Sequence, residues 1–341
     1  MSKVNTGNYF EDFTIGQKLA HATPRTVNAG DVALYQALYG SRFALNSSAG
    51  FATQLGYKAH PIDDLLTFHL VFGKSVPDIS LNAVANLGYA NGRFLAPVYP
   101  GDTLSAASEV IGLKENSNGK TGVVYVRTIG VKNGETPVLD YIRWVMVNKR
   151  DAAAAAPTPQ APSLPEAVDA NDLVVPAVNL NTYNHTAAGS PHRFSDYDIG
   201  ETVTPPEGTT VEDAEHMMAT RLYQNTAKVH FNQFTQKDSR FGRRLVYGGH
   251  VISIARALSF NGLENAQWIA AINGGRHVAP CFAGDTVFAS TKVVDKAEVS
   301  DDFGALRLNL MAVKDRILDG HPAADDENVL LDFDYWALVP R

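Results

Sequence analysis

Hydrophobic and polar residues alternate with a period of two along four segments of the chain. Two of these segments lie in the first half, at residues 122–131 and 139–147, and two lie in the second half, at residues 304–313 and 331–339. Such alternation is typical of β-strands that bury one face and leave the other in water. Strands of this kind usually form antiparallel sheets. The pattern therefore predicts an antiparallel sheet in each half.

Helical segments precede these strands in both halves. We expect four helices, at residues 29–40, 63–73, 211–224 and 249–259. A Pro-x-x-x-Gly-Asp motif, which starts at Pro97 in the first half and at Pro280 in the second, is typical of a turn between two strands. A central helix followed by a run of antiparallel strands predicts an α+β fold in which a sheet wraps round the helix.

The two halves carry similar motifs in the same order. The matching pairs stand at residues 10–16 and 194–200 (FEDFTIG and FSDYDIG), 92–104 and 275–287 (GRFLAPVYPGDTL and GRHVAPCFAGDTV), and 138–147 and 330–339 (VLDYIRWVMV and LLDFDYWALV). The last pair aligns Trp144 with Trp336. Matches that keep their order along both halves indicate a duplicated domain.

A low-complexity segment separates the repeats. Residues 151–166, DAAAAAPTPQAPSLPE, are dominated by alanine and proline and show no periodic apolar pattern, which predicts an exposed linker. We therefore expect an N-terminal domain over residues 1–150, a linker over 151–190 and a C-terminal domain over 191–341. A chain of 341 residues is long enough for each domain to bury its own core.

Composition and charge narrow the classes of function. The net charge of −7 argues against a nucleic-acid-binding protein, which usually presents a basic face. A single cysteine, Cys281, excludes an internal disulfide and a multi-cysteine metal site, and we expect no metal. The N-terminus lacks the apolar core of a signal peptide, and no apolar run reaches membrane-spanning length. We therefore expect a soluble cytoplasmic protein without a membrane partner. The sequence leaves open whether the chain forms a homo-oligomer.

The segment from Tyr223 to Leu258 contains the densest set of candidate chemical groups. It places Asn225 and His230 five residues apart in an irregular stretch, which a basic loop, two adjacent glycines and an apolar helix follow. A polar pair beside an exposed helix start is suited to stabilising an oxyanion next to an activated water.

These motifs and their order resemble the MaoC-like, (R)-specific enoyl-CoA hydratase family of double hotdog proteins. Within that family, the segments YFEDFTIG, LYGSRF, PIDDLLTFHLVFGK, SLNAVANLGYANGRFLAPVYPGDTLSA and LYQNTAKVHFNQ are similar to the mesaconyl-CoA hydratases, also called β-methylmalyl-CoA dehydratases. The resemblance covers both halves, and it implies two tandem hotdog domains packed as a pseudo-dimer. It also implies a hydro-lyase that reversibly hydrates mesaconyl-CoA to β-methylmalyl-CoA, in acetate assimilation by the ethylmalonyl-CoA route. The acyl-CoA thioester is the implied partner, and no cofactor is implied beyond the coenzyme A of the substrate.

The family motif is an aspartate followed five residues later by a histidine, on a loop ahead of the central helix. Asn225 and His230 match this motif, and the repeat places Ser41 and Asn46 at the same positions of the first half. We therefore expect one catalytic site, in the second half. A histidine, with an ordinary pKa of about 6.5, can accept or donate a proton near neutral pH, whereas Asn225 can hold a water but cannot take its proton. Either His230 takes over the proton transfer that the family shares between two residues, or another carboxylate replaces the missing aspartate.

The resemblance further implies that a backbone N–H at the start of the central helix binds the thioester oxygen. Gly248 or Gly249 matches that place, and spacing does not choose between them. In the first half Asp63 and Asp64 stand there, where carboxylates favour a helix start.

Two kinds of cation are expected near the site. Basic residues suited to coenzyme A phosphates precede the second helix of the C-terminal half, namely Lys237, Arg240, Arg243 and Arg244. A substrate with a free carboxylate also needs a cation in its pocket, and Arg276, His250 and Arg221 are unranked candidates. Arg93 and Arg276 stand at equivalent repeat positions, which favours a shared role in the fold for that pair.

Other functions remain as alternatives. The chain could be an (R)-specific hydratase of other acyl chains, an acyl-CoA thioesterase, or a non-catalytic acyl-CoA binder, since a hotdog fold does not determine its chemistry. Retention of His230 beside the two glycines favours catalysis. The asparagine at position 225, where the family carries a carboxylate, is the best argument for the thioesterase or the binder.

Overall fold

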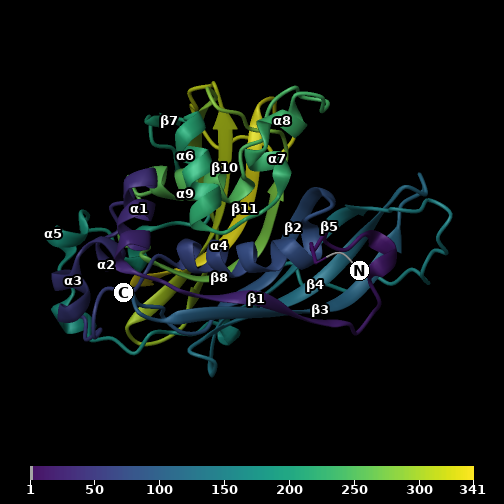
Figure 1. Ribbon diagram of the computed structural model, residues 1–341. Coiled ribbons are helices and arrows are strands. Elements are labelled where there is room, and N and C mark those ends of the chain that lie inside the picture. The colour runs from purple at the N-terminus through teal and green to yellow at the C-terminus, as the bar shows by residue number, and fades with distance from the viewer. Residues whose placement is uncertain (1–2) are drawn as a thin grey trace.

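The computed structural model describes residues 3–341 and contains an antiparallel sheet of eleven strands (Figure 1). The strands of the first half are β1 (Lys18–Thr26), β2 (Ala83–Phe94), β3 (Thr103–Glu115), β4 (Thr121–Lys132) and β5 (Thr136–Asn148). Those of the second half are β6 (Thr202–Val203), β7 (Gly208–Thr210), β8 (Trp268–His277), β9 (Thr286–Glu298), β10 (Phe303–Lys314) and β11 (Val329–Pro340). The four strands predicted from alternation correspond to β4, β5, β10 and β11 and are confirmed.

Both halves arrange their strands in the same order. From the outer edge to the middle, the first half runs β1-β3-β4-β5-β2 and the second runs β6-β9-β10-β11-β8, with β7 paired to β9. The halves join where β2 pairs antiparallel with β8, from Tyr89 opposite Gly275 to Arg93 opposite Ala271. The predicted double hotdog, an α+β fold built from a repeated unit, is confirmed.

One central helix packs against the sheet in each half. These helices are α4 (Asp64–Ser75), which contacts β1, β3 and β5, and α9 (Gly248–Leu258), which contacts β9, β10 and β11. Figure 1 shows α4 lying over the strands of the first half. The Asp63 side chain caps α4 by accepting a hydrogen bond from the Leu65 N–H at 2.8 Å, whereas no side chain caps α9. The start of α9 is therefore left open to a ligand.

Of the remaining helical segments, α1 (Ala29–Tyr39) and α6 (Asp213–Leu222) are about as long as α9, and the others are short. The short segments are η1 (Phe10–Asp12), α2 (Ala44–Ser47), α3 (Ala49–Gln54), the π-turn η2 (Val76–Ser80), η3 (Ala170–Asp172), η4 (Leu180–Thr182), α5 (His185–Ala188), η5 (Phe194–Asp196), α7 (Lys228–Phe231) and α8 (Gln233–Gln236). The four predicted helices correspond to α1, α4, α6 and α9 and are confirmed. Within residues 3–341, none of the helices combines the length and apolar character needed to cross a bilayer.

One hydrophobic cluster extends through both halves. Buried side chains from α4 and α9 belong to the same hydrophobic cluster. Residues at equivalent repeat positions also meet: the hydroxyls of Tyr39 and Tyr223 lie 2.6 Å apart, and His69 Nε2 lies 3.0 Å from Ser253 Oγ. Such contacts place the pseudo-twofold axis between the central helices. Side chains from both central helices therefore pack against one another across this axis, while a separate cluster around Phe10 and Val145 lies wholly within the first half.

The repeated Pro-x-x-x-Gly-Asp motif forms the same turn in both halves. Asp102 and Asp285 each accept a hydrogen bond from the backbone N–H three residues earlier, at 3.0 and 2.9 Å. Gly101 and Gly284 have φ angles of 99° and 98°, in the left-handed region that favours glycine. These turns connect β2 to β3 and β8 to β9, so the prediction from the motif is confirmed.

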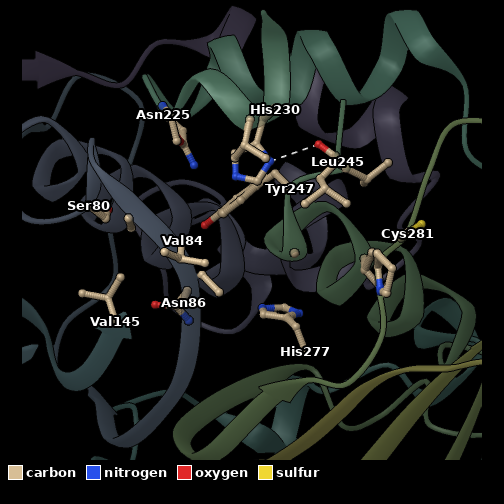
Figure 2. A pocket seen from close by; sticks show the side chains of 18 of the residues that line it. Ser80, Val84, Asn86, Val145, Asn225, His230, Leu245, Tyr247, His277 and Cys281 are labelled. Atoms are coloured by element: carbon tan, nitrogen blue, oxygen red, sulfur yellow. Dashed lines mark hydrogen bonds between the residues drawn. The ribbon is translucent and has the colours of Figure 1, made fainter. Parts of the chain in front are cut away.

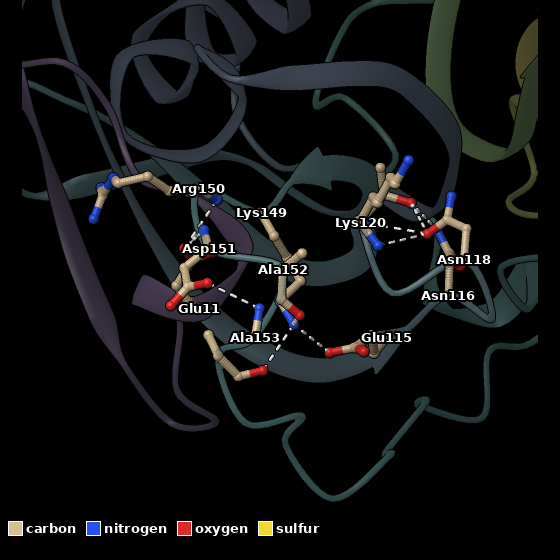
Figure 3. A network of polar contacts seen from close by, with 12 residues as sticks. Glu11, Glu115, Asn116, Asn118, Lys120, Lys149, Arg150, Asp151, Ala152 and Ala153 are labelled. Carbon is tan, nitrogen blue, oxygen red and sulfur yellow. Dashed lines mark hydrogen bonds and ion pairs between the residues drawn. The ribbon is translucent and has the colours of Figure 1, made fainter.

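The linker begins with a set of polar contacts (Figure 3). The backbone N–H groups of Arg150 and Asp151 both donate to the Glu11 carboxylate at 2.9 Å, and the Lys149 ammonium lies 3.0 Å from the Glu115 carboxylate. These contacts tie the end of β5 to η1 and β3. The start of the linker is therefore held in place against the first half by these hydrogen bonds and this ion pair.

Farther along, the linker crosses the outer face of the sheet. Gln160 exchanges two backbone hydrogen bonds of 2.8 Å with Leu113, and the Val168 carbonyl accepts one of 2.9 Å from the indole of Trp336. No residue between 151 and 166 is buried. The predicted exposure of this segment is confirmed, although backbone pairing holds it against the sheet.

Candidate active site

A cavity of about 370 Å³ lies between the two halves, beside the start of α9 (Figure 2). Its walls combine η2, β2 and β5 of the first half with residues 225–251 and 277–281 of the second. Its polar lining consists of Ser80, Asn86, Tyr89, Arg143, Asn225, His230, Tyr247, Gly248, His277 and Cys281. Across residues 3–341, no aspartate or glutamate lines this cavity. The site is therefore enclosed largely by neutral groups.

His230 lies on α7 at the wall of this cavity. Its Nδ1 donates a hydrogen bond of 3.0 Å to the carbonyl of Leu245, which leaves the Nε2 lone pair available (Figure 2). Although the residue keeps some exposure to the cavity, burial of its ring lowers the pKa to about 4. The imidazole is therefore neutral near pH 7 and can accept a proton through Nε2.

The first half repeats the anchoring bond of His230 without its chemistry. Asn46 Nδ2 donates to the carbonyl of Pro61 at 3.2 Å, and Pro61 is the repeat equivalent of Leu245. In both halves, the side chain at this motif position thus holds the segment that precedes the central helix. An amide offers no basic nitrogen, and Asn46 does not line the cavity that His230 lines.

Asn225 is buried on the same wall. Its Oδ1 accepts a hydrogen bond of 3.0 Å from the Ala227 N–H, so the group that it offers to the cavity is the Nδ2 amide. This amide can donate to the oxygen of a water or of a hydroxyl group. None of the described residues that line the cavity carries a carboxylate that could replace the family's aspartate. The imidazoles of His230 and His277 are therefore its strongest candidate bases.

Gly248 is the first residue of α9 and lines the cavity, whereas Gly249 does not. The amide of a first helical residue has no acceptor within the helix and lies at the positive end of the helix dipole. A Cβ atom on Gly248 would lie 2.2 Å from Cε1 of His277, so a side chain here would collide with the opposite wall. Gly248 is therefore the better candidate to receive a thioester oxygen.

Comparison with known proteins bears on the chemistry of this site. The family model described as mesaconyl-CoA hydratase matches residues 2–319. The chain belongs to the mesaconyl-CoA hydratase family. A β-methylmalyl-CoA dehydratase from Chloroflexus aurantiacus is 58% identical over 100% of this chain and 99% of its own length. A mesaconyl-CoA hydratase from Cereibacter sphaeroides is 59% identical over 99% of this chain and 100% of its own length.

Solved structures show the same fold. A MaoC domain protein dehydratase from Chloroflexus aurantiacus has a TM-score of 0.98 and 57% identity, covering 100% of this chain and 99% of its own. A Mycobacterium tuberculosis protein described as having a double hotdog fold has a TM-score of 0.76 and 25% identity, covering 98% of this chain and 99% of its own. The resemblance to MaoC-like double hotdog proteins is therefore confirmed.

The predicted basic loop lies beside the cavity. The guanidinium of Arg243 lies 3.9 Å from the centroid of the Phe282 ring, and that of Arg240 lies 5.3 Å from the centroid of Phe241, a residue that lines the cavity. Arg244 is already paired with an aspartate of α6 at 2.7 Å. Arg240 and Arg243 are therefore better placed than Arg244 to meet the phosphates of coenzyme A.

The three cations considered for a substrate carboxylate lie elsewhere. Successive residues of a strand point to opposite faces, so Arg276 projects from the outer side of β8 while the neighbouring His277 faces the cavity. The Arg276 guanidinium lies 3.4 Å from the Asp332 carboxylate. His250 is fully buried between the halves, 2.9 Å from the Tyr39 hydroxyl. Arg221 lines a separate surface groove. The structure brings none of them into the cavity that His230 lines, which corrects that expectation.

Several polar residues of the cavity were not anticipated, and two of them, His277 and Arg143, differ in type from their repeat equivalents. His277 ends β8, with its Nε2 3.1 Å from the Tyr89 hydroxyl, and Arg143 lies on β5. At the equivalent repeat positions stand Phe94 and Tyr335. These differences within otherwise matching motifs are visible in the sequence. They indicate a role at the site only when the structure shows that β2, β5 and α9 enclose one cavity.

Histidines around the site should make the stability of the protein depend on pH. Burial lowers the pKa to about 3 for His69 and His250 and to about 4 for His230 and His277. Below their ordinary pKa of 6.5, the unfolded chain therefore binds protons that the folded chain does not bind until about pH 4. Their contribution to stability is complete above pH 6.5 and is lost as the pH falls toward 4. Burial raises the pKa values of Asp63 and Asp64, that of Asp64 to about 7, so these two carboxyl groups act in the opposite direction, but as two groups against four.

The expected result is a Tm that falls steeply below about pH 6.5, measured by thermal unfolding between about pH 8 and pH 4.5. A Tm that stays constant from neutral pH down to about pH 5 would contradict the neutral state of these histidines.

Proposed function

We propose that this protein catalyses the reversible addition of water to the double bond of mesaconyl-CoA, which gives β-methylmalyl-CoA. The observation that carries the proposal is the neutral His230, whose free Nε2 lines the same cavity as the uncapped start of α9. The relatives named above, which match over essentially their whole lengths, support the choice of substrate. On this proposal the protein is a hydro-lyase.

The reaction begins with a water held by the Asn225 amide and His230 Nε2. As the water oxygen bonds to the β-carbon, Nε2 takes one of its protons, and the π electrons move toward the thioester carbonyl. The Gly248 amide and the positive end of α9 stabilise the resulting enolate oxygen. The enolate then collapses as the imidazolium gives its proton to the α-carbon. The net change is one hydroxyl on the β-carbon and one hydrogen on the α-carbon, and His230 ends neutral.

The coenzyme A portion of the substrate extends past Phe241 toward the basic loop. Arg240 and Arg243 stack on aromatic rings at this edge of the cavity and supply planar donor groups suited to phosphate oxygens. This placement assigns the basic loop a role in binding, whereas Asn225, His230 and Gly248 act on the reacting atoms.

Incubation with mesaconyl-CoA tests the proposal. Hydration removes the absorbance of the enoyl thioester without releasing a free thiol and adds one water to the mass of the ester. Release of free coenzyme A would instead identify a thioesterase. An unchanged ester would leave only binding and would overturn the assignment. Crotonyl-CoA, assayed in parallel, shows whether the activity extends to acyl chains without a second carboxylate.

Substituting Asn225 by aspartate should separate these two substrates. An aspartate can still accept the Ala227 N–H, but it brings a negative charge into a cavity that contains no other carboxylate. We expect activity on crotonyl-CoA to persist or rise. We also expect kcat/KM for mesaconyl-CoA to fall by about tenfold or more relative to crotonyl-CoA, because the two carboxylates repel each other at low dielectric. Equal effects on both substrates would reject charge as the reason for an asparagine at this position.

A further inference from the structure

Arg143 is a fully buried guanidinium on the wall of the catalytic cavity. It lies on β5 between Tyr141 and Val145, in the row of alternate residues that faces inward. The neighbours in that row are otherwise uncharged. A charged side chain at such a position costs much more free energy than an apolar one unless a partner compensates it.

The protein itself compensates this charge only in part. Nη2 lies 2.9 Å from the Ser75 hydroxyl and 3.4 Å from that of Ser80, and the guanidinium carbon lies 4.2 Å from the centroid of the Phe72 ring. Among residues 3–341, none forms a hydrogen bond with Nε. In the part of the chain that the structure describes, no carboxylate forms an ion pair with Arg143, and burial lowers its pKa. A donor and a net positive charge are therefore left for something that enters the cavity.

Arg256 shows how the same protein buries an arginine without leaving a donor for a ligand. Its Nη2 donates to the Ala266 carbonyl, and its guanidinium carbon lies 3.7 Å from the centroid of the Phe43 ring. Burial raises the pKa values of Asp63 and Asp64, and the charge of Arg256 opposes this by lowering them. Two carboxyl groups therefore lie close enough to Arg256 to interact with its charge. Arg256 does not line the catalytic cavity. Arg143 also packs against a ring, that of Phe72, but it lines the cavity and keeps an unpartnered Nε among the residues that the structure describes.

Two further unpartnered groups line the cavity with Arg143. The Tyr247 hydroxyl and both polar atoms of the Asn86 amide are buried, and no described residue forms a hydrogen bond with them. Burial keeps the pKa of Tyr247 well above its ordinary value, so the hydroxyl remains a donor. Figure 2 shows this hydroxyl directed toward the side of the cavity where Ser80 and Asn86 lie, away from Cys281. Leaving such donors unpaired is costly, which favours a ligand with acceptor oxygens at this side.

We infer that Arg143, with Tyr247 and Asn86, binds the free carboxylate of the substrate and makes the site selective for dicarboxylic acyl-CoA thioesters. The inference rests on the proposed hydration of mesaconyl-CoA. Because that carboxylate is bonded to the β-carbon, its capture also positions this carbon relative to His230. The N-terminal half, which lacks the motif histidine, thus supplies the recognition group for the catalytic site of the C-terminal half.

Binding of two unreactive esters tests this role directly. Succinyl-CoA and butyryl-CoA carry four-carbon acyl chains that end in a carboxylate and in a methyl group, respectively. In calorimetric titrations, Arg143→Met should weaken succinyl-CoA binding by about 30-fold or more, the scale of removing one partner of a buried charge pair. Binding of butyryl-CoA should change by less than about threefold, because a methyl group makes no charge-assisted hydrogen bond. Equal weakening of both esters would mean that Arg143 only supports the fold, and would overturn the inference.

Two further variants keep the test decisive. Arg256→Met removes a buried arginine outside the cavity and should leave the ratio of the two affinities unchanged. Arg143→Lys keeps the charge but loses the planar fork, so it should weaken succinyl-CoA binding selectively even if Arg143→Met does not fold. Thermal unfolding of each variant reports on folding. An unchanged affinity ratio in a folded Arg143→Lys or Arg143→Met protein would overturn the inference.

Kinetics separates this inference from the proposed function. Arg143→Met should lower kcat/KM for mesaconyl-CoA far more than for crotonyl-CoA. Wild-type protein that fails to hydrate mesaconyl-CoA would overturn the proposed function, while the titrations would still report on carboxylate binding. Wild-type activity together with an unchanged mesaconyl-to-crotonyl ratio in Arg143→Met would overturn only the role of Arg143.

Discussion

Replacing His230 by asparagine is expected to lower kcat for the hydration of mesaconyl-CoA by about a hundredfold or more. The asparagine Nδ2 can donate to the Leu245 carbonyl in place of the histidine Nδ1, as Asn46 donates to Pro61 in the first half. The substitution therefore removes the proton acceptor, Nε2, and keeps the bond that holds the segment before α9. Initial rates at saturating substrate measure kcat, and an unchanged Tm shows that the fold is intact.

The matched control is Asn46→Ala, which removes the hydrogen bonds from Asn46 Nδ2 to the carbonyls of Pro61 and Ile62 in the first half. It should lower Tm and leave kcat within about threefold of wild type, since Asn46 lies outside the catalytic cavity. A fully active His230→Asn protein would exclude His230 as the base. The assignment would then pass to His277, the other imidazole in the cavity.

Replacing Gly248 by alanine should also lower kcat/KM by about a hundredfold or more, the scale of losing one oxyanion donor. The added Cβ would lie 2.2 Å from Cε1 of His277, so either this ring or the first turn of α9 must move. Movement of the turn misplaces the amide that receives the thioester oxygen. Steady-state kinetics with mesaconyl-CoA measures the loss.

A double substitution tests the cause of this loss. In a His277→Ala background the colliding ring is absent, so Gly248→Ala should cost much less there than in the wild-type protein. Two substitutions that act through one contact are not additive. Fully additive losses would contradict the collision as the cause, and wild-type activity in the Gly248→Ala protein would contradict the placement of the oxyanion at this amide.

Most of the fold could be predicted from local patterns. Period-two alternation identified β4, β5, β10 and β11, and the turn motif ending at Asp102 and Asp285 marked the connections between strands. These signals depend on neighbours in the sequence, so a single chain displays them. The shared core was not predicted. It depends on contacts across the pseudo-twofold axis, such as that between Tyr39 and Tyr223, and no local pattern reports them.

The candidate site divides in the same way. Asn225, His230 and Gly248 lie within a short stretch of chain whose order resembles a family motif, so the sequence was enough to select them. The repeat aligns Trp144 with Trp336, so it also aligns Arg143 with Tyr335. The sequence therefore showed that an arginine in the first half corresponds to a tyrosine in the second. Alignment alone did not show that this difference matters.

The sequence by itself determined the repeated α+β unit, the loss of the motif histidine from the first half and the family to which the chain belongs. The tertiary structure determined which groups share the cavity. Pairing of β2 with β8 brings Arg143 of one half to the same cavity as His230 and Gly248 of the other. The alternation of β8 turns His277 inward and Arg276 outward. Proximity between residues more than eighty positions apart arises only when the sheet forms, which is why Arg143 could not be recognised from the sequence.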